Sequence, residues 1–138
     1  MKKLFLGVVM LLSFATLNAQ TTPTVTPASV ASFDKVKHSF GKIKQGTPQS
    51  ISFTLKNTSS KPLIIEQATA QCGCTTPEYS KAPILIGKST PIKVTYNAAN
   101  AGPFTKTVTV KFLNIPEPTV LTIEGEVLKG AEPTKKEN

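Results

Sequence analysis

The sequence predicts an all-β protein, an immunoglobulin-like antiparallel β-sandwich of about seven strands. Three observations predict this class. Several segments alternate apolar and polar residues with the period of two of a half-buried strand, turn-forming residues separate these segments, and no window of about ten residues carries a helical apolar stripe. An antibody-type domain is not predicted, because Trp is absent and the two cysteines are close together in the sequence.

Seven segments are expected to form strands: residues 35–40, 50–57, 62–70, 82–86, 91–97, 104–112 and 119–127. In residues 50–57, for example, Ile51, Phe53 and Leu55 share one face, and polar residues occupy the other. The same alternation selects the expected core: Val36, Phe40, Ile51, Phe53, Leu55, Ile92, Val94, Tyr96, Phe104, Val108, Val110, Phe112, Leu121, Ile123 and Val127.

Two residues interrupt this alternation. Lys106 shares the parity of the apolar residues in its strand, so we expect it near the end of a sheet. Gly125 stands where residues 119–127 should present a side chain, which indicates a bulge or a close approach of another backbone. Both positions are therefore expected to depart from a regular sheet.

The chain is expected to have four parts: a signal peptide (1–19), a Thr- and Pro-rich extended linker (20–32), the sandwich domain (33–128) and a polar C-terminal tail (129–138). Lys2 and Lys3 precede a short apolar run, and small residues lead up to the expected cleavage between Ala19 and Gln20. The predicted location is periplasmic or secreted.

No stable membrane insertion is expected after signal cleavage. The apolar run of residues 4–15 is shorter than the roughly 20 residues that cross a bilayer, and no second such run follows. A lipid anchor would need a cysteine at the cleavage point, and the first cysteine is Cys72.

The charge of the chain is positive but does not predict nucleic-acid binding. The formal net charge is +8, from 16 basic and 8 acidic residues, and removal of Lys2 and Lys3 leaves 14 − 8 = +6. All the basic residues are Lys, whereas recognition of bases and phosphates draws heavily on Arg. The lysines are spread singly among the expected strands, as on a solvated face.

The sequence predicts that the protein is not an enzyme and binds no cofactor. His38 is the only histidine, Asp34 the only aspartate, and the chain has neither a Gly-rich phosphate loop nor a Ser nucleophile motif. Glu124 and Glu126 alternate with apolar residues on an expected strand, which is typical of a solvated face rather than a catalytic pair.

The segment Cys72-Gly73-Cys74-Thr75 is the most distinctive motif, and three interpretations of it remain open. In an extended strand the two Cα atoms would lie about 6.5–7 Å apart, at the outer limit for a disulfide. Gly73 permits backbone angles that could bring the cysteines closer. The first interpretation is a local structural element, free or disulfide-bonded, although so short a loop would restrain few unfolded conformations.

The second interpretation of Cys72 and Cys74 is a redox pair, because a strained, accessible disulfide exchanges readily with other thiols. No helix N-terminus is expected there to lower a thiol pKa, so Lys81 or His38 would have to lie nearby. The third interpretation is a metal site formed with His38. That site would be weak, because structural zinc needs four ligands, and His38 shares the parity of core residues and is expected at the core margin.

Several motifs together resemble a known group of proteins. "HSFGKIKQG", "FTLKN", "KPLII", "CGCTTP", "IKVTYN", "GPFTKTVTV" and "LTIEGEV" occur in this order between residues 33 and 128. They resemble a family of secreted or lipid-anchored proteins of unknown function from Bacteroidetes, with a Cys-Gly-Cys-Thr signature. That family is similar to the immunoglobulin-like domains of hydin, abnormal-spindle and major sperm protein. The resemblance implies the sandwich fold and an envelope location.

Two functions are hypotheses at this point. The first is a non-enzymatic immunoglobulin-like domain that contacts another envelope protein through its loops or a sheet edge, since exposed edges accept partner strands. The second is a thiol–disulfide or copper-handling protein that uses Cys72 and Cys74.

Overall fold

A computed structural model describes residues 24–130, which form one sandwich of two β-sheets. The predicted signal peptide, residues 1–19, and nearly all of the predicted tail lie outside the described residues. The elements are α1 (Pro27–Val30), β1 (Ala31–Phe33), β2 (Lys37–Lys44), β3 (Gln49–Asn57), β4 (Ile65–Ala70), β5 (Thr75–Glu78), β6 (Ser89–Tyr96), β7 (Gly102–Phe112) and β8 (Thr119–Leu128). Within the described part, no helix is long and apolar enough to cross a membrane.

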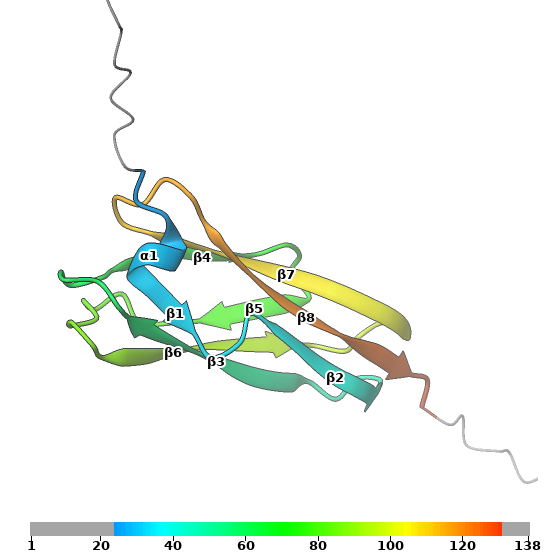
Figure 1. The fold of residues 1–138 in the computed structure, drawn as a ribbon. Helices are drawn as coiled ribbons and strands as arrows, with labels where there is room; N and C mark the ends of the chain where they lie inside the picture. Colours follow the sequence, from blue (N-terminus) through cyan, green and yellow to red (C-terminus); the bar gives the residue numbers. More distant parts are fainter. Residues whose placement is uncertain (1–23, 131–138) are drawn as a thin grey trace, which may run out of the picture.

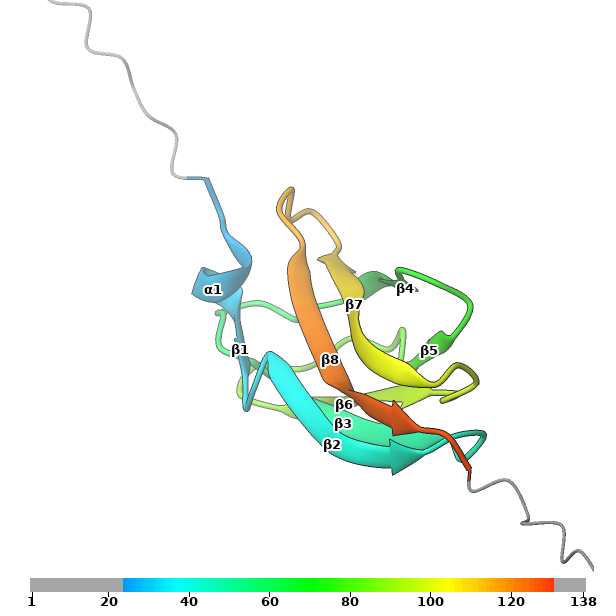
Figure 2. The ribbon, with the colours of Figure 1, turned by 90° about the vertical axis from the view of Figure 1, so that its right-hand side faces the viewer.

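The two sheets have four strands each, in the orders β1-β3-β6-β5 and β2-β8-β7-β4. They pack face to face (Figure 1), and the view turned by 90° shows both layers (Figure 2). This confirms the predicted fold class. All strand pairs are antiparallel except β2 and β8, which run parallel.

The chain changes sheets five times, and two of these crossings are corners that join one edge strand to another, on opposite sides of the sandwich. Between β1 and β2 it leaves the edge of the first sheet and joins the edge of the second. Between β4 and β5 it crosses back, from the opposite edge of the second sheet to the opposite edge of the first. The Cys72–Cys74 segment forms this second corner.

The core lies between the sheets and consists largely of the residues that the alternation selected. Phe53, Leu55, Ile92, Val94, Val110 and Phe112 are fully buried, and Tyr96, Phe104, Val108, Leu121, Ile123 and Val127 nearly so. Phe40 and Ile51 are half-buried against this core. Val36 is the exception: it precedes β2, outside the sheet, and is 50% exposed.

Three expectations about the elements were wrong. The linker expected over residues 20–32 includes α1 and most of β1, and β1 pairs with β3 from Ala31 onward. The segment 82–86 is not a strand but forms one isolated bridge, Leu63 to Ile84. Strand β5 was not expected, because Thr75–Glu78 is short and contains Pro77.

The alternation breaks at Gly125, where the structure has a close backbone approach. Gly125 faces a β-bulge in β2, where the register shifts between Ser39 and Lys42 and Gly41 has a φ of +65°. A Cβ atom on Gly125 would lie 2.7 Å from the carbonyl oxygen of Gly41 and 2.9 Å from Cε1 of Phe104. The sequence-based expectation of a close approach at this glycine is confirmed.

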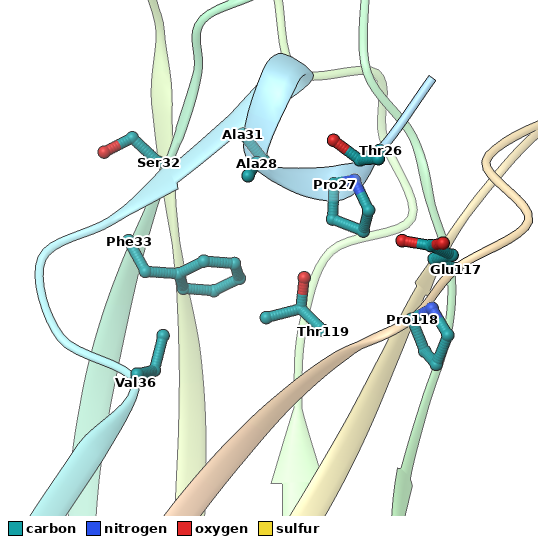
Figure 3. Close-up of a pocket in the computed structure, with 10 residues that line it drawn as sticks. All are labelled: Thr26, Pro27, Ala28, Ala31, Ser32, Phe33, Val36, Glu117, Pro118 and Thr119. Atoms are coloured by element: carbon teal, nitrogen blue, oxygen red, sulfur yellow. The ribbon is translucent and has the colours of Figure 1, made fainter. Parts of the chain in front are cut away.

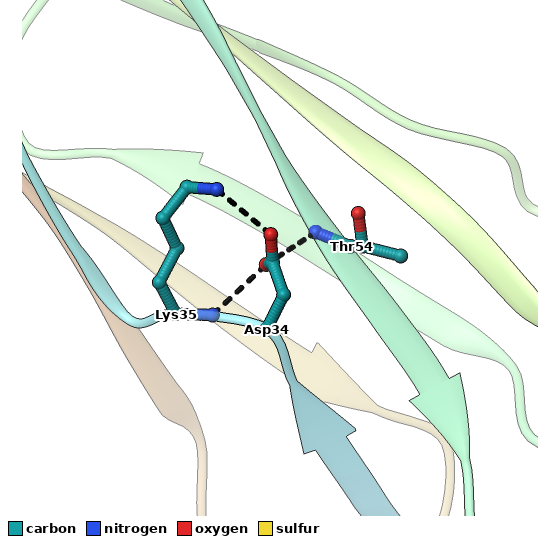
Figure 4. A network of polar contacts seen from close by, with 3 residues as sticks. All are labelled: Asp34, Lys35 and Thr54. Atoms are coloured by element: carbon teal, nitrogen blue, oxygen red, sulfur yellow. Dashed lines mark hydrogen bonds and ion pairs between the residues drawn. The ribbon is translucent and has the colours of Figure 1, made fainter.

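Asp34 stabilises the corner between β1 and β2 (Figure 4). Its carboxylate accepts hydrogen bonds from the backbone N–H of Thr54 at 2.8 Å and of Lys35 at 2.9 Å, and pairs with the Lys35 ammonium at 2.7 Å. The Lys35 ammonium is the largest cause of a lowered Asp34 pKa; the two N–H groups act in the same direction, and desolvation opposes them.

We expect Asp34→Asn to lower the free energy of unfolding by about 0.5–1 kcal/mol at neutral pH, a small value because solvent screens this partly exposed pair. Since the folded pKa lies below the ordinary value of 3.8, the stabilisation is complete above that value and is lost as the pH falls through the folded pKa. Urea unfolding of wild type and variant from neutral pH into acid measures this. A gap between wild type and variant that persists in acid would contradict the assignment.

Candidate functional site

The candidate site is the corner between β4 and β5, where the only two cysteines of the chain form a disulfide. Their Cα atoms lie 5.3 Å apart, within the usual range for disulfides. Gly73 does not have a positive φ, and a Cβ atom there would meet nothing within 4 Å. The turn itself, rather than special glycine geometry, therefore brings the cysteines together, contrary to expectation.

Backbone hydrogen bonds hold the corner independently of the disulfide. Gln71 N–H donates to the carbonyl of Thr107 on β7 at 3.0 Å, and Asn97 N–H donates to the carbonyl of Cys74 at 3.0 Å. Within the turn, Thr75 N–H donates to the carbonyl of Cys72 at 3.3 Å. Both sheets thus support the turn, and reduction of the disulfide would leave these contacts available.

The two sulfurs have different surroundings. Cys72 and Cys74 are both half-buried, but of the two only Cys74 packs against the hydrophobic core. The side chain of Thr75 is 3% exposed, and its hydroxyl lies 3.9 Å from Sγ of Cys72 and 3.8 Å from Sγ of Cys74. A disulfide has no S–H to donate, so the hydroxyl is the donor in both contacts.

One lysine is placed toward this corner by strand register. Ala70 pairs with Val108, and the Gln71–Thr107 hydrogen bond continues the register. The next residue along β7 is Lys106, while Cys72 lies in the turn after the end of β4, beyond the last paired residue, Ala70. Lys106 is half-buried although it shares the parity of core residues, because the sheet is one strand narrower beyond the end of β4.

His38, the third ligand of the weak metal hypothesis, is not brought to the cysteines. It lies on β2, whereas Cys72 follows β4, at the opposite edge of the same sheet. Three strand spacings separate these edges, roughly 14 Å. The His38 ring instead packs edge-on against Phe40, with centroids 4.8 Å apart. Among residues 24–130, no three His, Cys, Asp or Glu side chains are grouped to hold a metal ion.

The glutamates of β8 are arranged as a solvated face. Glu124 forms an ion pair with Lys37 of the neighbouring strand β2, with 2.9 Å between Nζ and Oε2. In the parallel register with β2, Glu124 is the partner of Ser39 and Glu126 is the partner of Lys42. This arrangement provides cross-strand pairing on the sheet surface rather than a proton donor and acceptor in a cleft.

The free sheet edges are a second candidate feature, and they differ in how well they are protected against strand addition. Strand β1 has three residues, and β5 has four and contains Pro77. Strand β2 carries three lysines and the Gly41 bulge. Strand β4 has six residues with neither Lys nor Pro, and its one irregularity lies at its start, between Ile65 and Gln67. Of the four edges, β4 is the least protected.

The outward-facing backbone groups of β4 follow from its pairing with β7. In an antiparallel ladder, hydrogen-bonded and non-hydrogen-bonded pairs alternate. Gln71 bonds to Thr107, so Thr69 and Gln67 also bond to β7, and the N–H and C=O groups of Ala68 and Ala70 point to the open edge. Within the described part of the chain, no backbone bond outside the β7 ladder uses them.

At the other end of the β4 edge, another segment of the chain already bonds to the backbone. Leu63 N–H donates to Ile84 C=O at 2.9 Å, and Ile84 N–H donates to Leu63 C=O at 2.7 Å. This isolated bridge lies in the segment 82–86, which was expected to form a strand. The free stretch of the edge is therefore bounded by the Leu63–Ile84 bridge on one side and by the disulfide on the other.

A hollow of about 540 Å³ lies between the N-terminal segment and the start of β8. Phe33 and Thr119 face each other across it, with Pro27 and Val36 at its margins (Figure 3). Glu117 is the one ionisable residue in the lining, so the hollow lacks the pair of groups that acid–base catalysis needs.

A family model described as "Protein of unknown function (DUF1573)" matches residues 31–127, the whole sandwich. The chain belongs to the DUF1573 family. No curated protein matches it. Membership agrees with the expected resemblance to a family of unknown function, and it places the disulfide corner and all four sheet edges inside the family domain.

Solved structures similar to this DUF1573 domain share its fold at low sequence identity. A protein of unknown function from Porphyromonas gingivalis W83 has a TM-score of 0.63 and 16% identity, over 78% of this chain and 51% of that one. The ASH / PapD-like domain 7 of human CEP192 has a TM-score of 0.64 and 9% identity, over 83% of this chain and 97% of that one.

A third similar structure is the VesB protease of Vibrio cholerae, with a TM-score of 0.59 and 16% identity over 72% of this chain. The match covers 32% of the protease chain. The DUF1573 chain likewise spans about half the length of the Porphyromonas protein. At these identities the likeness establishes the sandwich fold alone.

Proposed function

We propose that this DUF1573 protein is a non-enzymatic domain of the bacterial cell envelope, periplasmic or secreted, that binds another envelope protein by accepting a strand at the β4 edge. The observation that carries the proposal is that the N–H and C=O groups of Ala68 and Ala70 face outward from the β4 edge. Of the four edge strands, β4 is the one that is neither short nor protected by lysine or proline.

The disulfide supports an extracytoplasmic location. Disulfides form and persist in oxidising compartments and are rare in the cytosol. The bond between Cys72 and Cys74 therefore agrees with the signal peptide expected at residues 1–19. The N-terminus of protein purified from the envelope fraction should be Gln20; an uncleaved chain recovered from the cytosol would contradict the location.

The side chains along β4 suggest what the partner strand is like. Ala68 and Ala70 are small, half-buried and packed against the core. Cys74 and Tyr79 flank β5, the edge strand that follows β4 in the chain and belongs to the other sheet, and they are also only partly buried. A partner strand with apolar residues on its inward face would cover these side chains, whereas a strand of alternating charges would not.

The test is photo-crosslinking in cells with a benzophenone amino acid at Thr69, which is exposed on β4. We expect an adduct that maps to one extended segment of a single envelope protein. A synthetic peptide of that segment should then slow hydrogen exchange at the Ala68 and Ala70 amides at least tenfold. Benzophenone at Thr76 on β5 is the matched control and should give little adduct.

Two sets of variants separate the edge from the loops. Ala68→Pro removes an outward donor without breaking a bond to β7, so it should abolish the Thr69 adduct while the domain remains folded. The double variant Leu85→Ser/Ile86→Ser removes two apolar side chains, each 58% exposed, from a turn and should have no effect. Loss of the adduct in the turn variant alone would assign binding to the loops instead.

A further inference from the structure

We propose that the Cys72–Cys74 disulfide is an electron acceptor in thiol–disulfide exchange with dithiols, with Cys72 as the attacked sulfur and Cys74 as the leaving group, assisted by the Thr75 hydroxyl. This activity goes beyond strand binding and does not depend on it. Three observations carry it: the unequal environments of the sulfurs, the buried hydroxyl beside them, and the support of the corner by other bonds.

The environments of the two sulfurs decide the direction of attack. Exchange requires an incoming thiolate to approach one sulfur along the S–S axis, from the side opposite the other. Cys74 packs against the hydrophobic core, which restricts approach to its sulfur. Cys72 lies in the bend before it and does not belong to that core packing. The sulfur of Cys72 is therefore the less obstructed of the two.

The Thr75 hydroxyl stabilises the group that leaves. A thiolate is a much stronger hydrogen-bond acceptor than a disulfide sulfur, and a better-stabilised leaving thiolate leaves faster. The hydroxyl is buried and has no partner among the described residues other than the two sulfurs, so it is already placed for Cys74 when the bond breaks. It offsets the desolvation that the apolar core imposes on that thiolate.

Positive charge is available from one neighbouring strand. Of the ionisable residues on the strands that flank the corner, Lys106 of β7 adjoins Thr107, whose carbonyl accepts from Gln71 N–H, and Tyr96 of β6 pairs with Thr75. Tyr96 stacks on Phe104, with ring centroids 4.0 Å apart, and so faces the core. Lys106 is the residue that favours the thiolate form of the reduced pair.

The exchange is balanced as two displacements. A thiolate of the external dithiol attacks Sγ of Cys72, which forms a mixed disulfide, and the Cys72–Cys74 bond breaks to release Cys74 as a thiolate that takes up a proton. The second thiol of the external dithiol loses its proton and attacks that molecule's other sulfur in the mixed disulfide, which releases Cys72 as a thiolate that takes up a proton. The external dithiol is oxidised to a disulfide, and two electrons and two protons pass to this chain.

The hydrogen bonds of Gln71 and Asn97 allow this change without unfolding. They do not involve the disulfide, and a loop closed between residues two apart restrains few unfolded conformations, so the disulfide adds little stability. The disulfide is therefore poorly suited to stabilise the fold and well suited to alternate between its oxidised and reduced forms.

The main test measures reduction of the purified oxidised protein by dithiothreitol at neutral pH, followed by alkylation and mass spectrometry. Thr75→Val should slow reduction about tenfold, and in the reduced protein it should raise the pKa of Cys74 alkylation by about one unit, since tenfold corresponds to 1.36 kcal/mol. Thr75→Ser keeps the hydroxyl and should stay within about twofold of wild type.

The matched control is Thr76→Val, the exposed neighbour of Thr75 on the same strand, which should exchange at the wild-type rate. Lys106→Gln should slow reduction about threefold at low salt, while Lys111→Gln, exposed on the same strand, should not. Wild-type rates in both Thr75→Val and Lys106→Gln would overturn the assigned roles.

A trapping experiment tests the direction of attack without relying on Thr75 variants. Cys74→Ser leaves Cys72 alone and should form a mixed disulfide with a disulfide-containing peptide at least tenfold faster than Cys72→Ser, in which the remaining sulfur packs against the core. Equal rates would overturn the assignment of Cys72. A wild-type disulfide that dithiothreitol reduces only in denaturant would overturn the redox proposal altogether, and would leave the β4 proposal unaffected.

Discussion

Replacing Asn57 by Ala is expected to lower the free energy of unfolding by about 3 kcal/mol, with a fall in Tm of roughly 15 °C. Asn57 ends β3 and is fully buried. Its Nδ2 donates to the carbonyls of Lys61 at 2.7 Å and Ile84 at 2.8 Å, and its Oδ1 accepts from Ser59 N–H at 2.9 Å. One side chain thus links three separate points of the loops at this end of the sandwich.

The loss is large because truncation removes every hydrogen bond of a fully buried side chain: Ser59 N–H is left without its partner, and the carbonyls of Lys61 and Ile84 each lose one of two donors. A buried group that loses its hydrogen bond costs about 1–3 kcal/mol, more than the net gain of making the bond. The Ile84 carbonyl also accepts from Leu63, so the bridge that closes the β4 edge would be weakened as well.

Chemical denaturation of Asn57→Ala beside Ser59→Ala measures this effect. Ser59→Ala removes the hydroxyl but keeps the backbone bond to Asn57, and should cost no more than about 1 kcal/mol. If the two variants were equally stable, the hydrogen bonds of Asn57 would not stabilise the loops as proposed.

Replacing Gly125 by Ala is expected to destabilise the protein by about 2 kcal/mol. The cause is space, because φ at Gly125 is not positive. The added Cβ would meet the carbonyl oxygen of Gly41 at 2.7 Å and the Phe104 ring at 2.9 Å. The ring can shift by a few tenths of an ångström, but the carbonyl belongs to the bulge that joins β2 to β8 and cannot move without opening the parallel pairing.

Gly73→Ala is the matched control, because a Cβ at Gly73 meets nothing within 4 Å and its φ is not positive. Thermal unfolding should show a change within about 0.5 kcal/mol for Gly73→Ala. The double variant Gly125→Ala/Phe104→Leu should recover only part of the loss, since it relieves the ring contact and leaves the carbonyl contact. Full recovery would mean that the bulge is not the obstacle.

The candidate site was predictable only in part. The sequence singled out Cys72, Gly73, Cys74 and Thr75 and placed them where a strand leaves its sheet. It did not indicate that Thr75 is buried or that Lys106 lies beside the β7 residue that bonds to Gln71, because both relations depend on strands far away in the sequence. The redox interpretation required Lys81 or His38 to lie near the cysteines, and the sheet order places His38 at the far edge.

Asn57 and the β4 edge were missed for the same reason. The run Asn57-Thr58-Ser59-Ser60 was a turn signal, and it does lie at a turn, but no local pattern indicates that an Asn side chain will bond to residue 84. An edge strand likewise has the composition of any half-buried strand, and only the sheet order reveals that nothing pairs with its second side.

Local patterns in the chain were enough to establish most of the strands, most of the side chains that face the core, and the close approach at Gly125, because alternation along a strand is a direct consequence of backbone geometry. Long-range packing set the parallel pairing of β2 with β8, the open edge at Ala68 and Ala70, and the surroundings of the disulfide. These features depend on which strands lie side by side, and that is settled by the free energy of packing the two sheets as a whole rather than by any short stretch of residues.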